Sequence, residues 1–109
     1  MKETGKIIIF ITASSKKEAH KFADILLTRR KAACVNVVPR VDSSFWWRGK
    51  LDTARENLLI IKTKASLLED VVNLVKAAHG YEVPEIIALP IIGGNEDYLK
   101  WIDNELRGD

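Results

Sequence analysis

Runs of β-branched residues and segments of helical period alternate along this chain in the order β-α-β-β-α-β, and this order limits the fold more than any other feature. Residues 6–13 (KIIIFITA) are continuously apolar, which predicts a strand buried in a sheet. A second strand is expected to begin near Ala33 and to continue through residues 45–50 (FWWRGK). Gly49 supplies a turn, and a third strand returns, strongest over residues 58–63. These two strands therefore make a long hairpin.

Two helices are expected between the strands. Ser15 and Glu18 have capping-box spacing before the first helix, and Ser66 and Glu69 repeat that spacing before the second. Apolar residues follow at helical spacing in both segments: Ala19, Phe22, Ala23 and Leu26, then Leu68, Val71, Val72 and Val75. Gly80 is expected to end the second helix as its cap residue in the left-handed conformation.

The C-terminal part of the chain predicts one more strand and a short helix. EIIALPII at residues 85–92 indicates the fourth strand, with Pro90 near its end. Asn95 is expected to cap the last helix, whose apolar face comprises Tyr98, Trp101, Ile102 and Leu106. In the second strand, Pro39 lacks an N–H donor and predicts a bend, a bulge or an edge position.

This order of elements predicts a ferredoxin-like α+β fold in a single domain over residues 1–109. One antiparallel sheet would carry both long helices on one face, with an additional C-terminal helix. The other face of the sheet would be left open although its strands are nearly all apolar. Self-association is the simplest way to cover such a face in so small a chain.

Composition excludes several classes of function. The net charge of +2 is too small to indicate a nucleic-acid partner. The longest early apolar run, residues 7–11, is too short to span a membrane. The single cysteine, Cys34, permits no internal disulfide, which favours a cytoplasmic location.

The sequence also lacks the arrangements that nucleotide-binding proteins and hydrolases require. Neither P-loop nor Gly-x-Gly-x-x-Gly spacing is present. With only two histidines, no nucleophile can be assigned an adjacent base and an orienting group. A non-enzymatic protein is therefore expected.

Five segments cover nearly all of the chain in order: AACVNVVP (32–39), FWWRGKL (45–51), ENLLIIKT (56–63), HGYEVPEI (79–86) and LPIIGGNEDYLKWI (89–102). Together they resemble the CutA family of divalent-cation tolerance proteins. The resemblance implies a tight homotrimer involved in tolerance of divalent metal ions. It also implies weak binding of Cu(2+)-like ions or other divalent cations.

His79 is the metal-binding candidate to which the resemblance points, with Glu56 and Glu82 as acidic neighbours. An imidazole with carboxylates suits Cu(II) and other divalent cations. Two positions depart from the family pattern: Ile11 stands where some members have a cysteine, and Gly80 stands where proline is more common. The alternative interpretation of His79 is a helix-end residue that contacts the last carbonyl groups.

Four aromatic residues are candidates for the subunit interface: Phe45, Trp46, Trp47 and Trp101. The first three are consecutive on one strand, so a single core cannot bury all of them. The alternative is that two are buried and one is exposed. We favour the interface because tryptophan is enriched where subunits bind one another.

The other residues of the 79–86 segment have structural interpretations. Tyr81 is expected to pack with its hydroxyl on a polar group, and Pro84 to fix the entry into the fourth strand. A second hypothesis for the whole protein is a signalling or scaffold trimer resembling the PII proteins. Such a trimer would bind a small ligand or a protein partner in clefts between subunits.

Overall fold

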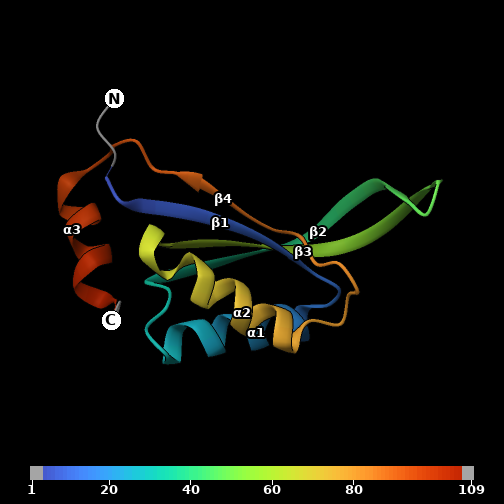
Figure 1. Cartoon of the computed structure of the whole chain (residues 1–109), viewed down its shortest axis with the longest axis horizontal. Helices are drawn as coiled ribbons and strands as arrows, with labels where there is room; N and C mark the ends of the chain where they lie inside the picture. Colours follow the sequence, from blue (N-terminus) through green and yellow to red (C-terminus); the bar gives the residue numbers. More distant parts are fainter. Residues whose placement is uncertain (1–3, 107–109) are drawn as a thin grey trace.

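β1 (Lys6–Ala13) runs through the middle of one antiparallel sheet, between β3 (Lys50–Lys64) and β4 (Ile86–Pro90) (Figure 1). The computed structural model describes residues 4–106. β2 (Cys34–Trp47) completes the sheet order β2-β3-β1-β4. The remaining elements are α1 (Lys16–Thr28), the 3-10 helix η1 (Ala65–Leu67), α2 (Leu68–Ala78) and α3 (Glu96–Glu105). This order and topology confirm the predicted ferredoxin-like fold.

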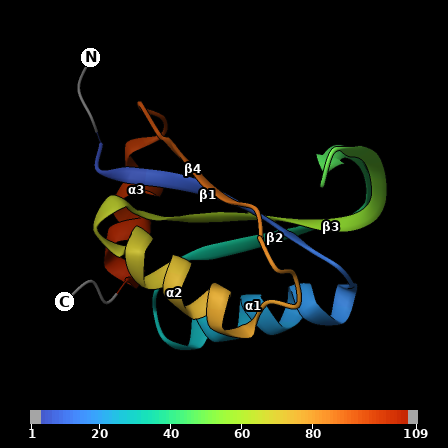
Figure 2. The ribbon, with the colours of Figure 1, turned by 45° about the vertical axis from the view of Figure 1, so that its right-hand side comes forward.

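The core lies between the sheet and the two long helices, which pack side by side on the same face (Figures 1 and 2). Alternate residues of β1 point toward the helices, as the two-residue period of a strand requires. The largest fully buried side chains of this core include Ile9, Ile11, Phe22, Leu26, Leu59, Ile61 and Val71. The apolar stripe predicted for α1 is confirmed, because all four of its residues are buried.

The opposite face of the sheet is apolar and is not covered by α1 or α2. Phe10 lies in register with Ile60 of β3 on one side and with Ile87 of β4 on the other. Ile87 and Leu89 are 53% and 45% exposed. Such a contiguous exposed apolar surface is uncommon on a monomer, and it agrees with the expectation that another molecule covers this face.

The hairpin formed by β2 and β3 extends past the rest of the sheet and curls toward one side (Figures 1 and 2). Pro39 lies in an irregularity of the β2–β3 register between Val38 and Val41, on an edge strand, as predicted. Arg40 in that irregularity has φ 60°. The tip turns through Arg48 and Gly49, both at positive φ, which matches the twist of a hairpin.

The two predicted capping boxes differ in outcome. The Ser15 hydroxyl oxygen accepts a hydrogen bond from the Glu18 N–H at 3.0 Å, which caps α1 as expected. The second prediction is wrong, because Ser66 lies inside η1 and α2 starts after Leu67 without a side-chain cap. Leu67 is 1% exposed and packs with Ile102 of α3, so burial of this side chain fixes the chain where a cap was expected.

The final helix forms as predicted, but its apolar face is divided. The Asn95 side chain caps α3 by accepting from the Asp97 N–H at 3.0 Å. Ile102 is buried, whereas Tyr98 and Trp101 are 41% and 40% exposed. Their rings contact one another, with centroids 5.4 Å apart.

Two adjacent leucines of α1 test the core directly. Leu26 is fully buried, whereas Leu27 is 39% exposed. We expect Leu26→Ala to lower the free energy of unfolding by about 2–5 kcal/mol, because it removes buried methyl groups and leaves a cavity. Leu27→Ala should cost about 0.5 kcal/mol or less. Urea unfolding at one fixed protein concentration measures both, and equal losses would contradict this assignment of the core.

Candidate functional site

His79 directly follows α2, and its side chain is completely buried beneath the start of the 79–86 segment. The Nε2 atom lies 2.8 Å from the carbonyl oxygen of Thr12, at the end of β1. The Nδ1 atom accepts a hydrogen bond from the Tyr81 N–H at 3.0 Å. An imidazole with its proton on Nε2 satisfies both contacts, so both ring nitrogens are engaged by the backbone.

Aromatic packing holds the same imidazole from two sides. The ring centroid of His79 lies 5.0 Å from that of Phe22 in α1 and 4.7 Å from that of Tyr81. Distances of this size are typical of favourable aromatic pairs. His79 therefore joins the end of β1, one face of α1 and the 79–86 segment. It follows the last turn of α2, as the alternative interpretation expected, but its ring bonds to the Thr12 carbonyl of β1 and not to the last carbonyl groups of α2.

Glu18 connects the first turn of α1 to the same segment. Its Oε1 atom accepts from the Ser14 N–H at 2.9 Å, and its Oε2 atom accepts from the Gly80 N–H at 3.0 Å. Burial by itself raises the pKa of this carboxyl, but the hydrogen bonds from Ser14 and Gly80 and the proximity of His79 bring the pKa below its usual 4.5. The folded state therefore favours the charged form of Glu18.

The prediction that Gly80 caps α2 in the left-handed conformation is wrong. The residue at the end of α2 is His79, in extended geometry with φ −82° and ψ 142°, and Gly80 is not among the glycines with positive φ. A Cβ atom at Gly80 would lie 3.2 Å from Glu18 Oε2. Glycine at position 80 thus avoids a tight contact with the oxygen that accepts the hydrogen bond.

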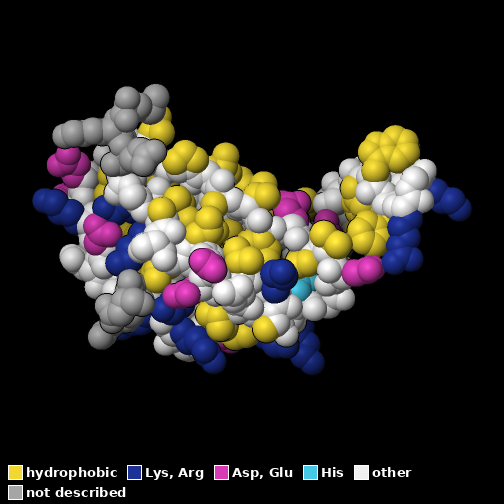
Figure 3. All heavy atoms as spheres, viewed as in Figure 1, with side chains coloured by type: hydrophobic (Ala, Val, Ile, Leu, Met, Phe, Trp, Pro, Cys, Tyr) yellow, Lys and Arg dark blue, Asp and Glu magenta, His cyan; other side chains and the backbone are white. Residues whose placement is uncertain are grey.

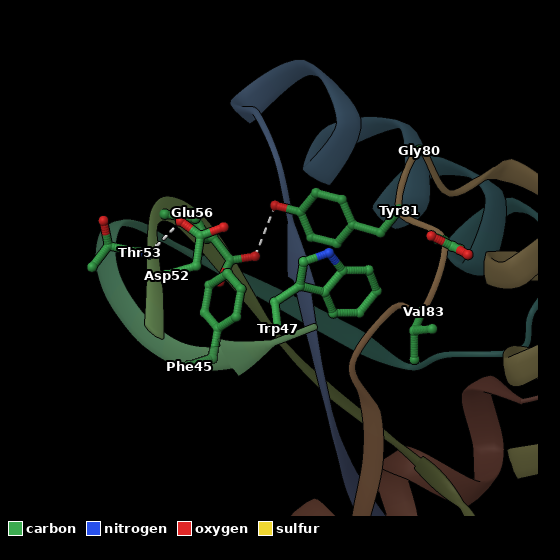
Figure 4. Close-up of a pocket in the computed structure, with 10 residues that line it drawn as sticks. Phe45, Trp47, Asp52, Thr53, Glu56, Gly80, Tyr81 and Val83 are labelled. Carbon is green, nitrogen blue, oxygen red and sulfur yellow. Dashed lines mark hydrogen bonds between the residues drawn. The ribbon is translucent and has the colours of Figure 1, made fainter. Parts of the chain in front are cut away.

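A cleft of about 360 Å³ separates the curled hairpin from the 79–86 segment. Its lining residues are Phe45, Trp47, Asp52, Thr53, Ala54 and Glu56 from the hairpin, and Gly80, Tyr81, Glu82 and Val83 from the segment (Figure 4). In the space-filling view the surface is hollowed between the hairpin and the body of the molecule, and acidic side chains lie in the hollow (Figure 3). Segments distant in the sequence therefore build one concave site.

Glu56 and Tyr81 meet inside this cleft. Glu56 is only 6% exposed, and its Oε2 atom accepts a hydrogen bond from the Tyr81 hydroxyl at 2.8 Å (Figure 4). Burial, the hydrogen bond to Glu56 and the Glu56 charge raise the pKa of Tyr81 to about 12, so Tyr81 remains a donor at neutral pH. The polar partner predicted for the Tyr81 hydroxyl is thus Glu56. Among residues 4–106, Glu56 forms no ion pair with a basic side chain.

Arg48 contacts two residues that line the cleft, although it does not line the cleft itself. Arg48 at the hairpin tip lies 2.9 Å from a carboxylate oxygen of Glu82, and its guanidinium carbon lies 5.4 Å from the ring centroid of Trp47. Both members of the ion pair are largely exposed, so its contribution to stability is small. The contact nevertheless connects the hairpin tip to the 79–86 segment.

The three candidate metal ligands have separate partners in this structure. His79 uses both ring nitrogens, Glu56 bonds to Tyr81, and Glu82 bonds to Arg48. Within residues 4–106, no three histidine, cysteine or acidic side chains are grouped closely enough to hold a metal ion. The residues present therefore do not fit a preformed metal site, and metal binding by them stays a prediction.

All three consecutive aromatic residues of the hairpin are exposed in the single chain. Phe45 and Trp47 are 37% and 38% exposed and line the cleft, whereas Trp46 is 71% exposed. The alternative of two buried aromatics is wrong, because this part of the hairpin lies beyond the core. The interface role of these residues and of Trp101 stays a prediction.

Two functional features were not visible in the sequence. Glu18 was expected only to cap α1, and nothing in its spacing indicates a bond to Gly80, which is 62 positions later. The contact of Arg48 with Trp47 and Glu82 depends on the curl of the hairpin. A turn at residues 48–49 was predictable, but the direction in which it points was not.

The model of the CutA1 divalent ion tolerance protein family matches residues 7–105. This chain belongs to that family. The divalent-cation tolerance protein CutA of Archaeoglobus fulgidus is 45% identical over 91% of this chain and 96% of its own length. The chloroplastic protein CutA 1 of Oryza sativa is 48% identical over 93% of this chain but only 57% of its own length.

Solved structures agree with this membership. The crystal structure of CutA1 from Oryza sativa has a TM-score of 0.92 and 46% identity, and the match covers 95% of each chain. The CutA1 protein from Thermus thermophilus has a TM-score of 0.91 and 39% identity, covering 94% of this chain and 99% of that one. The chain spans 57% and 61% of the two plant relatives it matches. None of the helices in residues 4–106 has the length and apolar character of a membrane span.

The lowered pKa of Glu18 predicts a pH-dependent contribution to stability. Because the pKa is lower in the folded state than in the unfolded state, the contribution is fully present above pH 4.5 and is lost as the pH falls below that value. Glu18→Gln should therefore cost about 1–2 kcal/mol at pH 7 and less at pH 3. Urea unfolding across this range measures the difference. Asp24→Asn, at an exposed position of the same helix, is the control. A cost of Glu18→Gln that does not change with pH would contradict the assignment.

Proposed function

We propose that this protein acts in the tolerance of divalent metal ions, without catalysing a reaction. The supporting observation is the match of residues 7–105 to a family described as divalent ion tolerance proteins. That description names a tolerance role and no reaction.

The metal contact that we propose is weak binding of Cu(II)-like ions at the exposed carboxylate of Glu82, near His79. Glu82 is two-thirds exposed, and its present partner is a surface arginine that an ion can replace at small cost. His79 would have to break a backbone hydrogen bond to coordinate an ion, so its contribution should be secondary. Among divalent ions, copper is favoured by oxygen and nitrogen ligands in general.

Isothermal titration with Cu(II) tests this proposal. We expect weak binding that Glu82→Gln reduces more than His79→Phe does, because the imidazole is already occupied. Glu69→Gln, on the exposed surface of α2, is a control for general loss of charge and should bind as the wild type does. The metal proposal fails if the wild type binds no Cu(II), or if Glu69→Gln and Glu82→Gln have equal effects.

We further propose that the protein is a homotrimer. The exposed apolar face of β1 and β4 supports association, as does the exposed aromatic cluster at the hairpin. In a closed symmetric assembly, the same exposed face or strand edge is covered on every subunit. Trp46 and Trp101 are the proposed aromatic anchors outside the cleft, and Phe45 and Trp47 lie at its rim.

Sedimentation equilibrium at micromolar concentration tests the assembly. The wild type should have three times the mass of the 12.3 kDa chain. Ile87→Glu should shift the distribution toward monomers, because it places an unpaired charge on the proposed buried face. His20→Glu, at an exposed position of α1, should leave the mass unchanged. A monomeric wild type would remove the interface proposal.

The second candidate function is a signalling or scaffold trimer similar to the PII proteins. The observation that favours it is a cleft built from two distant segments, which could bind a small ligand or a partner.

We also propose that the protein works in the cytoplasm, because its single cysteine, Cys34, is free.

A further inference from the structure

We propose that the cleft between the hairpin and the 79–86 segment binds a small organic cation, specifically a protonated primary alkylamine. The proposal goes beyond metal tolerance and does not require that the protein bind a metal. It rests on one buried carboxyl group, three aromatic rings and a cation–aromatic contact that the chain already makes at the mouth of the cleft.

Glu56 supplies the negative charge. Its side chain lines the cleft, and the residue is only 6% exposed. A buried carboxylate is normally paired with a cation, because isolated burial of charge is costly. Glu56 has the Tyr81 hydroxyl as a neutral donor and forms no ion pair within residues 4–106. An ammonium group entering the cleft would provide the missing counter-charge.

Three aromatic rings border the same space. Phe45 and Trp47 come from β2, on alternate positions of one strand, and Tyr81 faces them from the other wall (Figure 4). Aromatic faces attract alkylammonium groups through the negative potential of the ring, and tryptophan does so best. Val83 adds an apolar contact for an alkyl chain, and this residue is 69% exposed without a ligand.

The chain contains an internal example of this recognition. The guanidinium of Arg48 lies over the Trp47 ring and pairs with Glu82, at the outer part of the cleft. An aromatic ring and a carboxylate therefore already hold one organic cation there. The inner carboxyl, Glu56, has no such partner among residues 4–106, and a ligand with a single ammonium group would complete the arrangement.

The same geometry disfavours a metal ion at Glu56. A divalent cation needs several ligands, and no suitable group of three is present in the part of the chain that the structure describes. A strongly hydrated ion also gains little from Phe45, Trp47 and Tyr81. A protonated amine, by contrast, uses the hydrogen-bond acceptor and the rings together.

Nuclear magnetic resonance of the three tryptophan indole N–H groups provides the test, with the full chain and constant ionic strength. The probe is n-butylammonium, and n-butanol is its neutral counterpart. We expect butylammonium to shift the Trp47 signal saturably and the Trp101 signal little. Glu56→Gln should weaken binding by about tenfold, since it removes a charge-assisted hydrogen bond.

Two control variants make the comparison specific. Glu69→Gln removes a carboxylate far from the cleft, and Tyr98→Leu removes an exposed aromatic ring on α3; both should bind butylammonium as the wild type does. Trp47→Leu should weaken butylammonium binding several-fold. This variant provides a second test of the cleft if Glu56→Gln does not fold. Loss of binding in Glu56→Gln or Trp47→Leu, without loss in the controls, supports the proposal.

Four outcomes would overturn it: no saturable shift, equal binding of butanol, equal weakening by Glu69→Gln, or a cleft filled by a second copy in the assembly. A parallel Cu(II) titration separates this inference from the proposed function. If the protein binds butylammonium but not Cu(II), only the metal proposal fails. If it binds Cu(II) but not butylammonium, only the present inference fails.

Discussion

The buried imidazole of His79 is the contact on which the geometry of the cleft depends. Through one hydrogen bond to the Thr12 carbonyl and one from the Tyr81 N–H, it ties the end of the central strand to the segment that forms the inner wall. Both bonds are made in a site shielded from water, where an unsatisfied group would be costly. The residue that resembles a metal ligand in the sequence thus has a structural role in the folded chain.

Glu18 supports that junction from the first turn of α1. Its carboxylate accepts a hydrogen bond from the Gly80 N–H, and a Cβ atom at position 80 would lie only 3.2 Å from the accepting oxygen. A proline at this position would have no N–H to donate to Glu18. Gly80 therefore provides one hydrogen bond between α1 and the 79–86 segment that a proline could not make.

The hairpin supplies the opposite wall of the cleft, and it also presents surface to other molecules. Its length comes from two continuous strands, and its curl accompanies the irregularity around Pro39. Because the tip lies beyond the core, Phe45, Trp46 and Trp47 stay exposed in one chain. Association and ligand binding would both use this region, so the assembly determines how much of the cleft remains open.

The sequence by itself determined the order of elements, the buried stripe of α1, the caps at Ser15 and Asn95, and the irregular edge strand at Pro39. These features depend on residue type and short spacing, which act locally. Tertiary structure decided the rest. At the start of α2, the buried Leu67 side chain holds the chain where a cap at Ser66 was expected. At the end of α2, Gly80 donates to the Glu18 carboxylate and does not adopt the expected left-handed conformation. Thr12, which binds His79, and Tyr81, which binds Glu56, are distant from these residues in the sequence. No local pattern could therefore reveal that both ring nitrogens of His79 are hydrogen-bonded, or that Glu56 forms no ion pair within residues 4–106.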